Sequence, residues 1–215
     1  DHKRARDNDE GLNTGGMGTV APNPYYTDEI AKECMEKIFL PTIKAMNAEN
    51  RTFKGCLYFG LMLTKDGPKV IEYNCRFGDP ETQVVLPLLE SDLFEIMQAV
   101  RNGMLSETEV KFSSGSACCV IMASDGYPEK YEKGFEISLP SPEPAGTEIY
   151  VAGAKLEGGK LLTNGGRVLG VTAKSDDLKS AINKAYEAVK LVHFKNAFYR
   201  TDIGQRALKA FKKEV

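Results

Sequence analysis

Three polar side chains at every second position, Glu72, Asn74 and Arg76, have the types and spacing of a metal-and-phosphate site. Side chains two residues apart in a strand lie on the same face, so a carboxylate, an amide and a guanidinium would stand in one row. Magnesium takes oxygen ligands and completes its octahedron with water and phosphate, and arginine binds phosphate bidentately. An edge strand with polar residues in water explains the spacing equally well, but Arg76 favours the metal-and-phosphate interpretation.

A predicted β-hairpin positions this row. Residues 57–63 form the first strand, and Lys65 to Pro68 supply the turn. In the second strand, Val70 is expected to lie on the same face as Glu72, Asn74 and Arg76. The opposite face, expected to be core, carries Ile71, Tyr73 and Cys75.

Two further acids, Asp79 and Glu81, follow the row. They could be additional ligands, or they could orient Arg76 and start the next helix. We favour the second role, because acids suit the first turn of a helix.

A glycine-rich run, Asn13-Thr14-Gly15-Gly16-Met17-Gly18, lies within residues 1–26, which show little apolar periodicity and are predicted to be loop. Glycine leaves backbone N–H groups unobstructed, so such a loop can approach a ligand closely. Lys3 and Arg4 lie nearby in the sequence. The alternative is a plain surface loop.

Helical spacing predicts two helices in the first half of the chain. The first begins after an N-cap at Thr27 and is ended or kinked by Pro41. The second begins after Ser91 as N-cap and stops at Gly103.

Beyond a polar boundary at residues 104–115, the chain becomes rich in strands. The predicted strands are Ala117–Ala123, Phe135–Leu139, Ile149–Leu156, Lys160–Thr163 and Arg167–Ala173. Ser175 is expected to cap a helix. The buried stripe of that helix would be Leu178, Ala181, Ile182, Ala185, Val189 and Val192. A last short helix would expose Lys209, Lys212 and Lys213.

Composition excludes several classes of partner. The net charge of −2 over 215 residues provides no basic field for nucleic acid or an anionic membrane. Five cysteines without a C-x-x-C spacing predict reduced, mostly buried thiols in a cytoplasmic protein. No apolar run approaches the roughly 18–20 residues of a membrane span. His193 is expected to be packed, and the charged start without Met favours a piece of a longer protein.

Four segments carry a resemblance to a known family. They are DHKRARDNDEGLNTGGMG, LYFGLMLTKDGPKVIEYNCRFGDPETQVVLPLL, LLTNGGRVLGVTA and FYRTDIGQRAL. Together they resemble the C-terminal half of the phosphoribosylamine–glycine ligases of the ATP-grasp superfamily, over nearly the whole chain. The resemblance implies an α+β fold: residues 1–112 as the C-terminal part of an ATP-grasp domain, and residues 113–215 as a small, mixed, β-rich C-terminal domain with helices.

The family's activity is to join glycine to 5-phosphoribosylamine at the expense of ATP, through a glycyl phosphate, in de novo purine synthesis. The resemblance implies Mg²⁺ or Mn²⁺ on Glu72 and Asn74, and Arg76 as the catalytic residue near the transferring phosphate. It also implies a set of residues that bind substrate or nucleotide: Lys3, Arg4, Asn13, Thr14, Gly15, Gly16, Gly18 and Asp79.

Two departures from the family pattern limit this expectation. The N-terminal half of such enzymes and their ATP-grasp lid are absent from the sequence, so the missing half is an expected partner. The first hairpin strand, Cys56 to Leu63, also lacks an acid that many ATP-grasp enzymes use as a metal ligand. The chain alone is therefore expected to be inactive, and the alternative function is a non-catalytic packing or binding module.

Overall fold

The computed structural model describes residues 1–211, so Lys212 and Lys213 lie outside the described residues. The chain divides into two compact units of mixed helix and sheet, which confirms the α+β class. Unit 1 comprises Asp1–Pro22, Asp79–Leu88 and Ser113–Val215, and unit 2 comprises Asn23–Gly78 and Leu89–Phe112. Each unit is thus assembled from separate stretches of sequence. The predicted boundary between residues 112 and 113 concerns contiguous domains and remains a prediction.

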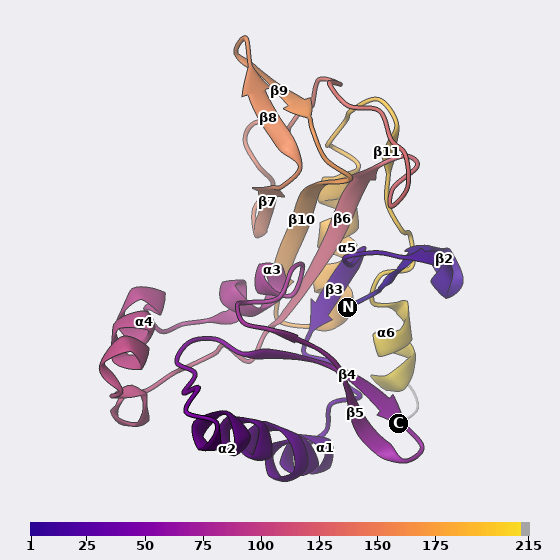
Figure 1. Ribbon diagram of the computed structural model, residues 1–215. Helices are drawn as coiled ribbons and strands as arrows, with labels where there is room; N and C mark the ends of the chain where they lie inside the picture. The colour runs from indigo at the N-terminus through magenta and orange to yellow at the C-terminus, as the bar shows by residue number, and fades with distance from the viewer. Residues whose placement is uncertain (212–215) are drawn as a thin grey trace. The chain divides into compact units, whose positions relative to one another are not determined.

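Unit 1 is built on a five-stranded antiparallel sheet (Figure 1). Its strands are β3 (Gly18–Ala21), β6 (Ser116–Ser124), β7 (Thr147–Val151), β10 (Arg167–Ser175) and β11 (Ala197–Phe198). β6 pairs with β10 on one side and with both β3 and β11 on the other. β10 then pairs with β7 at the edge.

Every residue of β6 is buried, as predicted for this segment, because both faces of the strand are covered. Alternate residues enter two different cores. Cys118, Val120 and Met122 pack in the cluster that includes helix α5 (Leu178–Val189). Ala117, Cys119 and Ile121 pack in a second cluster. That cluster is closed by Val84 of α3 (Thr82–Val85) and Leu88 of the 3₁₀ turn η3 (Leu86–Leu88).

The predicted apolar stripe of α5 is confirmed from Leu178 to Val189, whereas Val192 is buried beyond the end of the helix. The predicted cap is wrong. Ser175 is still in strand β10, where it pairs with Ser116. Asp177 is the N-cap instead: its Oδ1 accepts from the Ser180 N–H at 2.9 Å, and its Oδ2 accepts from the Ser180 hydroxyl at 2.6 Å. The prediction thus chose a serine that lies upstream of the aspartate that caps the helix.

The same correction applies to α4 (Leu93–Asn102) in unit 2. Asp92, not Ser91, is its N-cap, and its Oδ1 accepts from the N–H groups of Phe94 and Glu95 at 2.7 and 3.1 Å. The predicted stop is confirmed, because Gly103 adopts φ 75°, a left-handed conformation that glycine tolerates.

Two predicted strands in unit 1 are wrong. Ile149–Leu156 is not one strand, because Ala152 and Gly153 separate β7 from β8 (Ala154–Glu157), which pairs with β9 (Lys160–Thr163). Gly153 N–H donates to the Arg167 carbonyl oxygen at 2.9 Å, and a Cβ added at Gly153 would lie 2.4 Å from that oxygen, so the close approach of the two backbones requires glycine here. Residues 135–139 make only isolated bridges, from Glu136 and Ser138.

The first 26 residues were predicted to be loop, but the structure contains strands there. They contain a ribbon of β1 (Arg4–Arg6) and β2 (Glu10–Asn13), joined by a 3₁₀ turn at Asp7–Asp9, before β3 enters the sheet. Both ribbon strands are short and largely exposed, so they carry no apolar alternation for a sequence pattern to detect.

Unit 2 opens with a long helical segment. Thr27 caps α1 (Asp28–Cys34) as predicted, accepting from the Ile30 N–H at 3.4 Å. A π-helical turn (Met35–Phe39) then leads into α2 (Leu40–Ala48), which contains Pro41 in its first turn. Pro41 therefore does not end the helix, because the wider turn, with Leu40 N–H bonded to Met35 O, precedes the residue that cannot donate.

The predicted hairpin is confirmed as β4 (Tyr58–Thr64) and β5 (Gly67–Asn74). Val70 was predicted to share a face with Glu72, but a register shift pairs Val70 with Leu61 and Glu72 with Gly60. The two side chains therefore lie on different faces. The face expected to be core is also wrong. Ile71 and Tyr73 are 61% and 51% exposed, and Cys75 is exposed.

All five cysteines are free, and Cys34, Cys118 and Cys119 are buried. His193, predicted to be packed, is exposed. Among residues 1–211, no helix has both the length and the apolar character needed to cross a bilayer.

Candidate active site

The row at the end of β5 belongs to unit 2. Glu72 and Asn74 pair across the hairpin with Gly60 and Tyr58, so they share one face of the ribbon. The partner of Glu72 is a glycine for a steric reason: a Cβ added at Gly60 would lie 2.7 Å from Glu72 Cγ. The missing side chain gives the glutamate room to lie over the neighbouring strand.

This donor set fits a hard divalent cation. Glu72 and Asn74 offer carboxylate and amide oxygens, and neither provides the nitrogen or sulfur ligands that zinc sites prefer. Within residues 1–211, no group of three or more His, Cys, Asp or Glu side chains is placed to hold a metal. A magnesium ion held here would therefore depend on water and phosphate for its remaining ligands.

Arg76 was predicted to continue the strand face of Glu72 and Asn74, but β5 ends at Asn74, so Arg76 lies in the bend that follows and is exposed. Its Nη1 donates to the carbonyl oxygen of the next residue, Phe77, at 2.7 Å. That bond orients the guanidinium locally and leaves the group at the surface, where a phosphate can approach it.

The glycine-rich loop belongs to unit 1, and its amides already have partners. Thr14 N–H donates to Lys3 O at 2.7 Å, and Gly15 N–H to the Tyr127 hydroxyl at 3.0 Å. Gly16 N–H donates to Thr14 Oγ1 at 3.0 Å, and Met17 N–H to His2 O at 2.8 Å. In this conformation these four N–H groups serve the protein itself, so the loop does not form a phosphate cradle of backbone amides.

Asp79 lies in unit 1 and is paired with an arginine that the sequence did not single out. Arg167 Nη2 donates to Asp79 Oδ2 at 2.8 Å, and Gln83 Nε2 donates to Asp79 Oδ1 at 3.2 Å. Asp79 is therefore paired with Arg167 within unit 1, and the role of orienting Arg76 that was favoured from the sequence remains a prediction. The available signal was the arginine that directly follows Asn164-Gly165-Gly166.

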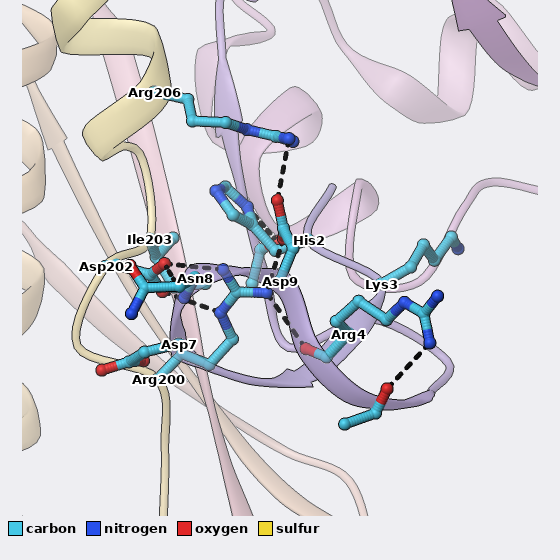
Figure 2. Close-up of polar contacts among 12 residues, drawn as sticks. His2, Lys3, Arg4, Asp7, Asn8, Asp9, Arg200, Asp202, Ile203 and Arg206 are labelled. Carbon is cyan, nitrogen blue, oxygen red and sulfur yellow. Dashed lines mark hydrogen bonds and ion pairs between the residues drawn. The ribbon is translucent and has the colours of Figure 1, made fainter.

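Lys3 and Arg4 also lie in unit 1, and both contact neighbouring parts of the chain. Lys3 Nζ pairs with Asp1 Oδ2 at 2.7 Å, and Arg4 Nη1 donates to Gly11 O at 2.8 Å. Both side chains are exposed at one end of the polar network drawn in Figure 2.

The centre of that network is Arg200, whose side chain is 1% exposed (Figure 2). Its Nε and Nη2 bind the two carboxylate oxygens of Asp202 at 2.8 Å each. Its Nη1 donates to Asp9 Oδ1 at 3.0 Å and to Arg4 O at 3.1 Å. Asn8 N–H also donates to Asp202 Oδ2 at 2.9 Å. The buried guanidinium thus holds the ribbon that carries Lys3 and Arg4.

The charges of this network stabilise one another. Although burial raises the pKa of the Asp202 carboxyl, hydrogen bonds from Arg200 and Asn8 outweigh that effect and lower the pKa to about 2. Burial likewise opposes the charged form of Arg200, but Asp202 and Asp9 outweigh it and raise its pKa. Sequence reasoning missed Arg200, although it lies in the FYRTDIGQRAL segment.

His2 is a second buried link in unit 1. Its Nδ1 donates to Gly18 O at 3.1 Å, and its Nε2 accepts from the Gly204 N–H at 3.2 Å, which is the pattern of a neutral ring. Burial is the main reason that the pKa of His2 falls to about 4.

Acidification is therefore expected to destabilise the protein through His2. The unfolded ring takes up a proton near pH 6.5, and the folded ring does so only near pH 4. The neutral His2 ring therefore makes its full contribution to the free energy of unfolding above pH 6.5, and this contribution is lost as the pH falls towards 4. At pH 5 the free energy of unfolding is expected to be lower by about 2 kcal/mol for this reason. Urea unfolding at pH 7 and pH 5 measures this difference.

His2→Gln is expected to flatten this dependence, whereas His193→Gln, which leaves His2 in place, is expected to retain it. An unchanged slope in His2→Gln would contradict the assignment.

Comparisons with known proteins show the family and the fold of the chain. Residues 1–82 match the ATP-grasp (A) domain of phosphoribosylglycinamide synthetase, and residues 117–206 match its C domain. The fold is similar to the crystal structure of phosphoribosylamine–glycine ligase from Thermotoga maritima, with a TM-score of 0.80 and 39% identity over 94% of this chain and 50% of that one. The chain thus has an α+β fold of the ATP-grasp type. It belongs to the phosphoribosylglycinamide synthetase family.

Similar sequences occur in enzymes of different length. The chain is 45% identical to the phosphoribosylamine–glycine ligase of Clostridium acetobutylicum over 95% of its own length and 49% of the relative. It is 50% identical to the trifunctional purine biosynthetic protein adenosine-3 of Gallus gallus over 97% of its length and 21% of the relative. The chain therefore spans about half of the one relative and about a fifth of the other.

Proposed function

We propose that this chain is part of an ATP-dependent ligase that joins glycine to 5-phosphoribosylamine, giving glycinamide ribonucleotide, ADP and phosphate. The observation that carries the proposal is the pair of Glu72 and Asn74 on one face of β5, with Arg76 just beyond the strand, in a chain that matches both the ATP-grasp and the C domain of one ligase family. Relatives named phosphoribosylamine–glycine ligase support this substrate class.

In the proposed reaction, ATP phosphorylates the glycine carboxylate, and the amine of phosphoribosylamine then displaces phosphate from the glycyl phosphate. Glu72 and Asn74 would hold Mg²⁺ or Mn²⁺, which when bound neutralises phosphate charge. The exposed Arg76 guanidinium would bind the transferring phosphoryl group and stabilise its negative charge. Lys3 and Arg4, on the ribbon, would face the substrates.

The partner in this proposal is an N-terminal half carried by the same longer enzyme. Supporting it, the relatives extend well beyond the matched region. β4 also supplies no acid beside Glu72, so the metal would take its further ligands from nucleotide and water. We place the reaction in the cytoplasm, in keeping with five free cysteines.

The test compares this chain with the longer polypeptide that contains it. With ATP, glycine, phosphoribosylamine and Mg²⁺, the longer enzyme is expected to form glycinamide ribonucleotide and ADP in equal amounts, and omission of any one component is expected to abolish the product. The chain alone is expected to form none and to bind MgATP weakly, as measured by calorimetry. Product from the isolated chain would contradict the need for a partner half, and an inactive longer enzyme would contradict the function.

A further inference from the structure

Arg167, at the start of β10, joins two segments of unit 1 that are far apart in the sequence. Its Nη1 donates to Gly15 O at 3.0 Å, Gly16 O at 3.3 Å and Asp79 O at 3.1 Å, and its Nη2 donates to Asp79 Oδ2 at 2.8 Å. One guanidinium therefore joins the glycine-rich loop to Asp79, which lies three residues after Arg76 in the sequence.

The glycines of the loop are explained by this contact. A Cβ added at Gly15 would lie 2.9 Å from Arg167 Cζ, and one added at Gly16 would lie 2.5 Å from Pro80 Cδ. The absent side chains thus allow the guanidinium and the 79–80 segment to reach the loop backbone. Since the N–H groups of Thr14 to Met17 are also occupied within the protein, packing against Arg167 accounts for Gly15, and packing against Pro80 accounts for Gly16, without a bound ligand.

The Gly15 peptide unit is held from both sides by residues of the C-terminal part of unit 1. Its carbonyl accepts from Arg167, and its N–H donates to the Tyr127 hydroxyl at 3.0 Å. Arg167 is partly accessible, with 20% of its side chain exposed, so this contact lies close to the surface and not in the buried core.

We propose that Arg167 is a positioning residue for the ligase reaction: it orients Asp79 and the loop Thr14–Gly16, whose side chains and backbone would contact the substrates, with respect to each other. The inference rests on the proposed function. Arg167 acts through other residues because the carbonyl oxygens and the carboxylate that it binds belong to the protein. Lysine has a single charged nitrogen and cannot reproduce a fork that reaches four acceptors.

The test is steady-state kinetics of the full-length enzyme with Arg167→Ala and Arg167→Lys. Both variants are expected to lose about 10- to 100-fold in kcat/KM, because small displacements of binding groups have effects of this size. KM for at least one substrate is expected to rise. A merely destabilised enzyme would contain fewer active molecules but keep its KM. Lys174→Ala is the matched control, since Lys174 is an exposed cation of the same strand that donates to Pro87 O at 3.1 Å.

Gly15→Ala provides a second route to the same contact. Its new methyl group would displace the guanidinium, so this variant is expected to resemble Arg167→Ala, and the double variant to be no worse than the poorer single one. Full activity in Arg167→Lys, or kcat/KM within threefold of wild type in Arg167→Ala, would overturn the proposal while leaving the ligase function intact. A wild-type enzyme that forms no glycinamide ribonucleotide would instead contradict the function itself.

Discussion

Replacing Arg200 by alanine is expected to lower the free energy of unfolding by about 3–5 kcal/mol, the size of effect seen when one partner of a buried ion pair is removed. The guanidinium is almost completely buried and donates to Asp202, Asp9 and the Arg4 carbonyl. Its loss would leave the partly buried Asp202 without the guanidinium that binds both of its oxygens, whereas Asp9 would keep its ion pair with Arg206. Urea unfolding followed by circular dichroism measures the change.

The matched control is Arg206→Ala. Arg206 Nη1 donates to Asp9 Oδ2 at 2.9 Å, but its side chain is 63% exposed, so its loss is expected to cost about 0–1 kcal/mol. Comparable losses in the two variants would show that burial is not the source of the effect. A loss below 1 kcal/mol in Arg200→Ala would contradict the conclusion that the buried guanidinium holds the N-terminal ribbon.

Replacing Glu72 by alanine is expected to lower kcat of the full-length ligase by about 10²- to 10³-fold, because a metal ion contributes several kcal/mol of charge stabilisation. Asn74→Ala is expected to act in the same direction. Both residues lie on one face of β5 at the end of an exposed hairpin, so neither change removes a buried core contact. The measurement is the rate of ADP release at saturating ATP, glycine and phosphoribosylamine.

Lys69→Ala is the control for this prediction, since Lys69 is an exposed residue of the same strand. It is expected to keep wild-type turnover. In Glu72→Gln, the Mg²⁺ concentration for half-maximal rate is expected to rise, which separates a ligand from a residue that only shapes the hairpin. If Glu72→Ala and Asn74→Ala folded normally and kept full turnover, the competing hypothesis of a non-catalytic packing module would be favoured.

Local features of this chain could be predicted because their causes are local. The β4–β5 hairpin, the buried strand β6 and the apolar stripe of α5 follow from side-chain periodicity and turn residues that adjoin each other in sequence. One error arose because a neighbouring element used the same residue: Ser175 could not cap α5, since it still pairs in β10. Another arose because the short β1–β2 ribbon has no apolar alternation that a sequence pattern could detect.

The sequence by itself thus determined the α+β class, the family, and the common face of Glu72 and Asn74, which follows from their spacing along one strand. Only the tertiary structure decided which groups hold the other segments in place. Arg167 reaches Asp79 across 88 residues, and Arg200 reaches Arg4 across 196. A guanidinium binds whatever carbonyls and carboxylates the fold brings within about 3 Å, and no periodicity records that choice.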